Sequence, residues 1–176
     1  MFVSLEIVTL AVVIIGTVGT LMLVYVGIPR RKVKVSIRNA ASQDLRSKMS
    51  GVQSDDVIIT VANRGNQVTK IDLPTLIMHD GKEFDVSPRE YTDHIRPYHV
   101  TRLPINCGKN EFPHMLIPGD VCEIWTSHIK LAHWLVDNGY DGAVAIKFSF
   151  PDKLSGRKYV SDEYTFNSAE TSGESN

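Results

Sequence analysis

The sequence predicts a mainly β protein, in which one N-terminal transmembrane α-helix precedes an antiparallel β-sandwich with one short helix. Two observations lead to this fold class. The 22 residues from Ile7 to Ile28 carry no charged side chain, and the chain after them alternates apolar and polar residues in short segments separated by turn residues. Alternation with a period of two is typical of strands with one buried face, and evenly spaced turns are typical of a sandwich.

The uncharged segment from Ile7 to Ile28 has the length of a membrane-spanning helix. At about 1.5 Å per residue it reaches roughly 33 Å, and the hydrocarbon core of a bilayer is about 30 Å thick. Pro29 and a basic block follow it where a signal peptide would have its cleavage site, and the residues before it include no Lys or Arg. We therefore expect residues 1–29 to be the retained signal anchor of a single-pass protein.

Basic residues flank this segment on its C-terminal side only. In the juxtamembrane segment 30–38, which runs into the first strand, they are Arg30, Arg31, Lys32, Lys34 and Arg38. Because Lys and Arg beside a spanning helix stay in the cytoplasm, we predict the N-terminus outside the cell membrane and the C-terminal domain in the cytoplasm. The same five residues are expected to contact anionic lipid of the bilayer.

Small residues recur along the predicted spanning helix. Thr9, Gly16, Thr20 and Gly27 are spaced by 7, 4 and 7 residues and therefore share one stripe. Small side chains let helices approach closely in lipid, so this stripe is a candidate face for self-association or for a partner helix. The alternative interpretation is that Gly and Thr are simply common in such helices.

The charges and cysteines of the remaining chain bear on its partners and its compartment. After Arg38 there are 14 Lys and Arg against 19 Asp and Glu, a net charge of −5. Such a domain lacks the basic face that nucleic acid requires, so no nucleic-acid partner is predicted. Cys107 and Cys122 fit either free thiols in a reducing cytosol or a disulfide in an oxidising compartment.

The β-domain is predicted over residues 33–166, and the small polar residues 167–176 are predicted to be a disordered tail. The β-branched segment 57–62 is expected at the centre of a sheet, because it is apolar on both faces. Asp80-Gly81 supplies the positive φ angles that a two-residue hairpin turn requires. Further strands are expected over 33–38, 67–73, 75–79, 82–86, 121–126, 144–150 and 158–166.

One short helix is predicted over residues 128–138, between two of these strands. Ser127 is expected to cap its start, and Gly139 is expected to end it in a left-handed conformation. The residues expected on its buried face are Ile129, Ala132, Leu135 and Val136.

Two turn motifs give the domain a resemblance to a known fold. The strand over 57–62 runs into Asn63-Arg64-Gly65-Asn66, and Leu116-Ile117-Pro118-Gly119-Asp120 opens a later strand. In these features it resembles the immunoglobulin-like or fibronectin-like β-sandwich modules of microbial single-pass membrane proteins, at the level of fold only. The resemblance implies no catalytic residues. The chain departs from antibody domains, because Trp125 follows both cysteines and the short helix is additional.

Residues 87–115 form the least regular segment and contain metal-ligating residue types without the close pairs of a zinc site. These residues are Asp93, His94, His99, Cys107 and His114. Nucleophile-elbow, P-loop, dinucleotide and H-E-x-x-H motifs are absent from the sequence. We therefore predict no metal, no cofactor, no small-molecule substrate and no catalytic residues.

The same segment carries aromatic and basic residues of the kind enriched at protein interfaces. They are Tyr91, His94, Arg96, Tyr98, His99 and Arg102. The alternative is that a long loop packs its own aromatic side chains over the sheet. The predicted function is a membrane-anchored, non-catalytic recognition or assembly module. It would be an accessory subunit that binds another protein, or a second copy of itself, at the cytoplasmic membrane face through this segment or an exposed sheet edge. An envelope-facing ligand-binding domain with reversed topology and a metal-dependent hydrolase remain alternatives.

Overall fold

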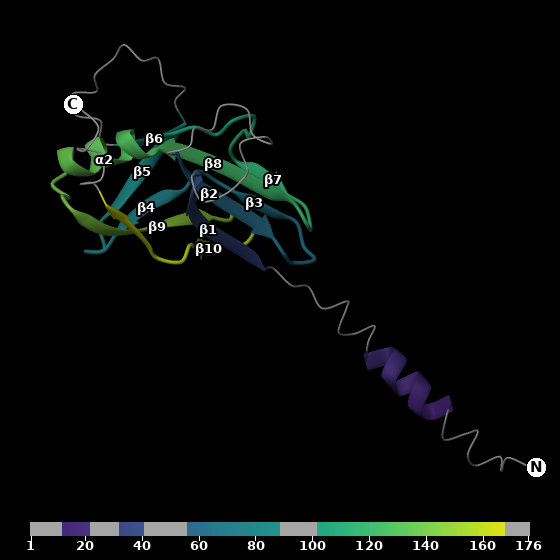
Figure 1. Ribbon diagram of the computed structural model, residues 1–176. Coiled ribbons are helices and arrows are strands. Elements are labelled where there is room, and N and C mark those ends of the chain that lie inside the picture. The colour runs from purple at the N-terminus through teal and green to yellow at the C-terminus, as the bar shows by residue number, and fades with distance from the viewer. Residues whose placement is uncertain (1–11, 22–31, 41–55, 89–101, 168–176) are drawn as a thin grey trace, which may run out of the picture. The chain divides into compact units, whose positions relative to one another are not determined.

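The computed structural model describes residues 12–21, 32–40, 56–88 and 102–167 (Figure 1). The chain divides into two compact units, Met1–Arg30 and Arg31–Asn176. The second unit is mainly β and contains several sheets.

The first unit contains a helix over residues 12–21, whose side chains are exposed. The ten described residues span about 15 Å, roughly half the thickness of a bilayer's hydrocarbon core. Within the described parts of the chain, no helix combines the length and the apolar character needed to cross a membrane. The predicted transmembrane helix and single-pass anchor are therefore wrong. The apolar character and length of the segment from Ile7 to Ile28 suggested them, because 22 uncharged residues match the thickness of a bilayer, whereas the described helix covers only ten of these residues.

One antiparallel sheet contains β1 (Val33–Asn39), β2 (Asp56–Asn63) and β8 (Val121–Ser127), with β2 in the middle. This confirms the central position predicted for the β-branched segment. Ile59 lies opposite Ile37 on one side and opposite Ile124 on the other. Because residues 56–59 of β2 are all buried, apolar residues are tolerated there at successive positions.

The second sheet has the order β10-β9-β4-β5-β6, and β11 also pairs with β9. Its strands are β4 (Thr75–Met78), β5 (Glu83–Pro88), β6 (Leu103–Ile105), β9 (Ala143–Pro151), β10 (Lys158–Val160) and β11 (Tyr164–Asn167). The hairpin predicted at Asp80-Gly81 is confirmed, with Gly81 at φ +84°. Its turn has three residues and not the predicted two, because the Met78 N–H donates 2.9 Å to the Lys82 carbonyl. The sheets are not antiparallel throughout as predicted, because β5 and β6 run parallel.

The strand predicted over 158–166 is interrupted by a bulge. Val160 lies opposite Ser149, whereas Tyr164 lies opposite Ile146, so the chain between the paired segments has one residue more on this strand than on β9. At this bulge the Ser161 hydroxyl accepts a hydrogen bond of 3.0 Å from the Phe148 N–H, which is thereby satisfied. The interruption separates β10 from β11.

The two sheets share one hydrophobic core, and the sheet of β1, β2 and β8 lies over the sheet that contains β4 and β9 (Figure 1). The fully buried side chains include Ile59, Ile124, Leu76, Phe148 and Phe150. As the sequence predicts, alternate residues of β9 point into this core. A third element, the two-stranded ribbon of β3 (Thr69–Ile71) and β7 (His114–Leu116), completes the strand pairing.

The predicted short helix is present as α2 (His128–Asp137), and Gly139 follows it at φ +86°. Ser127 stands at its start but makes no side-chain capping hydrogen bond. The predicted buried face is partly wrong, because Ile129 and Val136 are each 49% exposed. The buried residues are Leu131, Ala132, Trp134 and Leu135. The ring of Trp134 packs edge-on against the ring of Phe84 on β5, with the centroids 4.9 Å apart. This contact places the face of α2 that carries Trp134 toward the sheet.

Candidate functional site

Most of the predicted partner-binding cluster lies outside the described residues: Tyr91, His94, Arg96, Tyr98 and His99. Its remaining member, Arg102, stands just before β6. The guanidinium of Arg102 lies 3.9 Å from the carboxylate of Asp85, and both side chains are largely exposed. An exposed pair of this length contributes little to stability. The predicted role of this cluster stays a prediction.

The predicted membrane-surface residues fall into two groups within the described chain. Lys32 and Lys34 are exposed at the start of β1, whereas Arg38 is held in an ion pair on the sheet. Arg30 and Arg31 lie outside the described residues. The predicted placement of the domain at a cytoplasmic membrane face stays a prediction.

Two members of the predicted small-residue stripe, Gly16 and Thr20, lie in the N-terminal helix one turn apart. The Thr20 hydroxyl donates a hydrogen bond of 2.8 Å to the Gly16 carbonyl, which satisfies the hydroxyl within the helix. Thr9 and Gly27 lie outside the described residues. The stripe as a whole therefore stays a prediction.

The strand register places nine side chains in three rows on the outer face of the sheet β1-β2-β8. The rows are Lys34–Ala62–Val121, Ser36–Thr60–Glu123 and Arg38–Ile58–Trp125. Lys34 and Val121 are exposed, and the middle row is partly exposed. We call this surface the outer face. Its first two rows consist mostly of small or polar side chains and are partly or fully exposed, so they are open to a partner.

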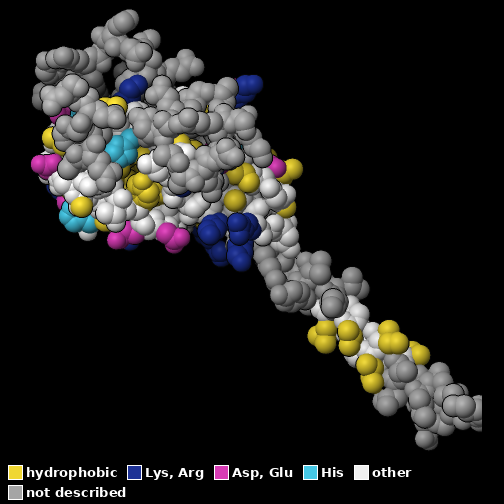
Figure 2. All heavy atoms as spheres, viewed as in Figure 1, with side chains coloured by type: hydrophobic (Ala, Val, Ile, Leu, Met, Phe, Trp, Pro, Cys, Tyr) yellow, Lys and Arg dark blue, Asp and Glu magenta, His cyan; other side chains and the backbone are white. Residues whose placement is uncertain are grey.

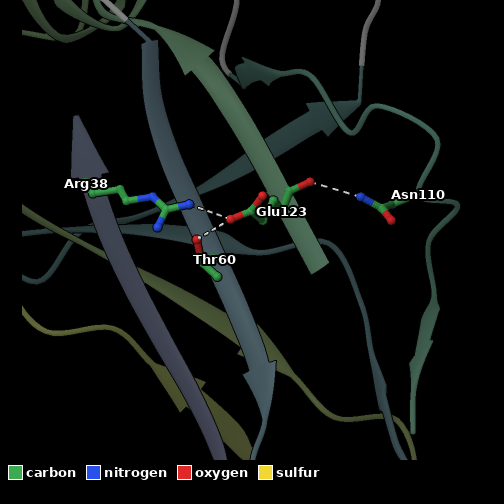
Figure 3. Close-up of polar contacts among 4 residues, drawn as sticks. All are labelled: Arg38, Thr60, Asn110 and Glu123. Atoms are coloured by element: carbon green, nitrogen blue, oxygen red, sulfur yellow. Dashed lines mark hydrogen bonds and ion pairs between the residues drawn. The ribbon is translucent and has the colours of Figure 1, made fainter. Parts of the chain in front are cut away.

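An ordered polar network crosses the outer face (Figure 3). The guanidinium of Arg38, on β1, reaches over β2 and donates a hydrogen bond of 2.6 Å to Glu123 Oε1. The same oxygen accepts a bond of 3.2 Å from the Thr60 hydroxyl. On the far side of β8, the Asn110 side-chain amide donates 2.9 Å to the Glu123 backbone carbonyl. Residues from three strands and one loop thus hold Arg38 and Glu123 in place, with about a quarter of each side chain exposed.

In the third row of the outer face, Ile58 and Trp125 are buried, whereas Arg38 keeps 28% of its side chain exposed. Ile58, Trp125 and Ala40 form a small buried cluster separate from the main core. Gly108 lies against this cluster, since a Cβ on Gly108 would stand 2.9 Å from Cη2 of Trp125. The polar network of Arg38 and Glu123 is therefore bordered by this buried apolar cluster on one side and by the exposed first row on the other.

The free edge of β8 is also covered. Asn106 and Trp125 exchange backbone hydrogen bonds of 2.7 and 3.0 Å, and the Thr126 hydroxyl donates 3.1 Å to the Pro104 carbonyl. The edge strands β6, β10 and β11 have only three or four residues, and β1 lies beside β10 (Figure 1). Short or covered edges resist the addition of another strand. Of the described surfaces, the outer face is therefore better suited to a partner than any sheet edge.

The chain matches no family model, no curated protein and no solved structure. The assignment of a site thus depends on the geometry of its own residues.

The two cysteines are free, and their chemistry is that of buried thiols. Burial raises the pKa of the Cys107 thiol to about 11. Burial, together with the neighbouring Cys107 and Glu123, raises the pKa of Cys122 to about 12. Nucleophilic cysteines require a lowered pKa, so neither thiol is activated for catalysis.

The candidate metal ligands are only partly described. Asp93, His94 and His99 lie outside the described residues, and His114 lies on β7 beside Phe112. Among the residues with described positions, no three His, Cys, Asp or Glu side chains are grouped to hold a metal ion.

Sequence reasoning missed Thr60, Asn110 and Glu123, which complete the Arg38 network. One signal was present for Glu123, because it stands between Cys122 and Ile124 in an apolar strand. A lone acid at such a position must face away from the core, and a basic residue on a neighbouring strand is its natural partner. The choice of Arg38 as that partner required the register of three strands, which no local pattern contains.

Proposed function

We propose that the second unit is an immunoglobulin-like recognition or assembly module, which binds another protein through the outer face. Its strand order supports the immunoglobulin-like assignment. The first, second and eighth strands share one sheet, while β4, β9 and the β10–β11 pair share the other. This is the division of immunoglobulin strands A, B and E from C, F and G, and β5 takes the place of the extra strand C′ of variable domains. The helix α2, the ribbon β3–β7 and the parallel strand β6 are additions.

The observation that carries the protein-binding proposal is the fixed position of Arg38, which keeps 28% of its side chain exposed beside the accessible first two rows of the outer face. Arginine is enriched at the residues that dominate interface energies, and a side chain that is already ordered loses little entropy on binding. Glu123 and Thr60 set this order through hydrogen bonds of 2.6 and 3.2 Å. The small side chains of Ser36 and Ala62 leave room for a partner to approach the sheet.

Site-specific cross-linking in cells tests this proposal. The photoreactive residue p-benzoylphenylalanine is placed at Ser36 on the outer face and, as a matched control, at Lys147 on the other sheet. Lys147 is also partly exposed and paired, 3.2 Å from Glu163. We expect a defined protein adduct from position 36 and none from position 147. Mass spectrometry then identifies the cross-linked protein.

The affinity of that identified partner provides the second measurement. Arg38→Ala should weaken binding by about 30-fold, the effect of an interface residue worth about 2 kcal/mol, whereas Lys147→Ala should leave it within a factor of two. Arg38→Lys should recover only part of the loss, because lysine lacks the planar fork of donors. Equal adducts from both positions, or equal effects of both alanine variants, would refute the proposal.

A further inference from the structure

The two turn motifs noted in the sequence meet around one buried residue, Asn63. Its backbone N–H donates 2.9 Å to the Asp120 carbonyl, and its own carbonyl accepts 2.9 Å from the Gly119 N–H. Its side-chain amide donates 3.0 Å to the Leu116 carbonyl and 2.8 Å to the Gln67 carbonyl. Asn63 is only 1% exposed, so it fastens the turn after β2 to the turn before β8.

The exposed side chains around this hub form what we call the Asn63 tip. Its members are Lys32, Arg64, Val68, Met115, Ile117 and Val121. The Arg64 N–H donates 2.7 Å to the Lys32 carbonyl, which joins the start of β1 to the same end of the domain. Val68 and Ile117 each adjoin the paired residues Thr69 and Leu116 of the β3–β7 ribbon.

Three apolar members of the Asn63 tip are more than half exposed. Met115, Ile117 and Val121 are 54%, 53% and 56% exposed. Figure 2 shows hydrophobic side chains on the side of the domain where β3 and β7 lie, and Lys and Arg side chains gathered near the start of β1. Single exposed aliphatic residues are normal, but several on one end of a domain mark an interaction surface.

Charge at this end has the opposite sign to that of the domain as a whole. Lys32, Lys34 and Arg64 are exposed, and the neighbouring acid, Asp120, accepts a hydrogen bond of 3.1 Å from the Ile117 N–H. The chain after Arg38 nevertheless carries a net charge of −5. A basic end on an acidic domain is drawn to an anionic surface and turns the rest of the domain away from it.

We infer that the Asn63 tip binds an anionic lipid surface. Lys32 and Arg64 contact lipid phosphates, and the aliphatic side chains of Ile117 and Val121 enter the headgroup layer, a combination typical of interfacial binding. A second copy of the chain fits less well, because a twofold contact would bring the basic residues of both copies together. Interfacial binding of this kind requires no membrane-spanning helix, and its basic residues, Lys32 and Arg64, lie outside the rows of the outer face.

Depth-dependent quenching tests the inference with the full chain. Ile117→Trp places a fluorophore on the Asn63 tip, and Ile129→Trp, at the other end of β8, provides a control of similar exposure. Vesicles contain either brominated phosphatidylcholine alone or the same lipid with about 30% phosphatidylglycerol. We expect strong quenching at position 117 only with the anionic vesicles, and no added quenching at position 129. The parent chain corrects for Trp125 and Trp134.

Charge neutralisation provides the second measurement. About 1 kcal/mol per basic residue corresponds to roughly fivefold in partitioning, so Lys32→Gln with Arg64→Gln should weaken anionic-vesicle binding about 25-fold. Lys130→Gln on α2 is the matched control and should have no effect. Circular dichroism establishes that each variant is folded. Quenching at 117 that is absent, equal for both vesicle types, or insensitive to the paired substitutions would overturn the inference. Equal quenching at 129 would overturn it as well.

Discussion

Replacing Asp152 by asparagine should destabilise the domain by about 2 kcal/mol at neutral pH, and the loss should shrink in acid. Asp152 stands at the turn between β9 and β10 and is 1% exposed. One carboxylate oxygen accepts hydrogen bonds from the N–H groups of Lys70, at 3.2 Å, and Leu154, at 3.0 Å. The other oxygen accepts from the hydroxyls of Ser155 and Tyr159. The carboxylate thus joins the turn to β3.

The magnitude follows from the loss of charge. Hydrogen bonds to charged groups contribute about 1.5–3 kcal/mol and neutral ones about 0.5–1.5, so the two backbone bonds each weaken by about 1 kcal/mol. The asparagine amide can still donate to the two hydroxyls, which limits the remaining loss. For a domain of about 135 residues, with an unfolding entropy of about 2.1 cal/mol/K per residue, 2 kcal/mol corresponds to a fall in Tm of about 7 °C.

The pH dependence has a definite sign. Burial alone would raise the pKa of Asp152, but the hydrogen bonds from Ser155, Leu154, Lys70 and Tyr159 outweigh it and hold the pKa below 3.8. An aspartate in the unfolded chain has a pKa of about 3.9. The stabilisation is therefore complete well above pH 4 and is lost as the pH falls through the lower, folded-state pKa.

Urea unfolding followed by tryptophan fluorescence at pH 7, 5 and 3.5 measures this difference. Asp162→Asn, at an exposed aspartate on the same sheet edge, is the control and should cost less than about 0.5 kcal/mol. The stability gap between the parent chain and Asp152→Asn should be equal at pH 7 and 5 and smaller at pH 3.5. A gap that persists unchanged at pH 3.5, or an equal effect of Asp162→Asn, would refute the reasoning.

Three further predictions concern other contacts. Gly108→Ala should cost about 1–3 kcal/mol more than Gly119→Ala in thermal unfolding, because both glycines have positive φ but only at Gly108 would the added Cβ meet a side chain, 2.9 Å from the Trp125 ring. A double-mutant cycle of Arg38→Ala and Glu123→Ala in urea unfolding should give a coupling of about 1 kcal/mol; a value near zero would show that the pair is not ordered in solution. In the folded chain at pH 8, both thiols should react with a disulfide reagent more than about 100-fold slower than in urea, because their pKa values are raised to about 11 and 12.

Local patterns predicted the β-elements well where one face is buried and a turn residue is distinctive. The alternation along residues 144–150 gave β9, and Asp80-Gly81 gave the hairpin of β4 and β5. Three-residue strands such as β6 and β7 carry too few positions for a period to be recognised. The face of α2 was ambiguous, because residues spaced three and four apart fit two neighbouring stripes, and the contact of Trp134 with Phe84 decided between them.

The polar contacts that define the candidate surfaces could not be predicted because they join distant parts of the chain. Arg38 and Glu123 are 85 residues apart, and Asn63 and Leu116 are 53 apart. The sequence does show each partner as an isolated anomaly, an acid within an apolar strand or an asparagine at a strand end. It does not contain the strand register, which depends on how the whole sheet packs.

The two proposed surfaces adjoin at Val121, which belongs both to the first row of the outer face and to the Asn63 tip. If the tip rests on anionic lipid, the strands of the outer face rise from that surface, and a partner bound to Arg38 would itself lie close to the lipid. Different residues serve the two activities. Arg38, which is held in an ion pair on the sheet, serves protein binding, and Arg64, which is exposed on a turn, serves lipid binding. Arg38→Ala should therefore impair protein binding with lipid binding intact, and Arg64→Gln should do the reverse. Loss of both activities in either variant would mean that one composite surface, rather than two, carries out recognition.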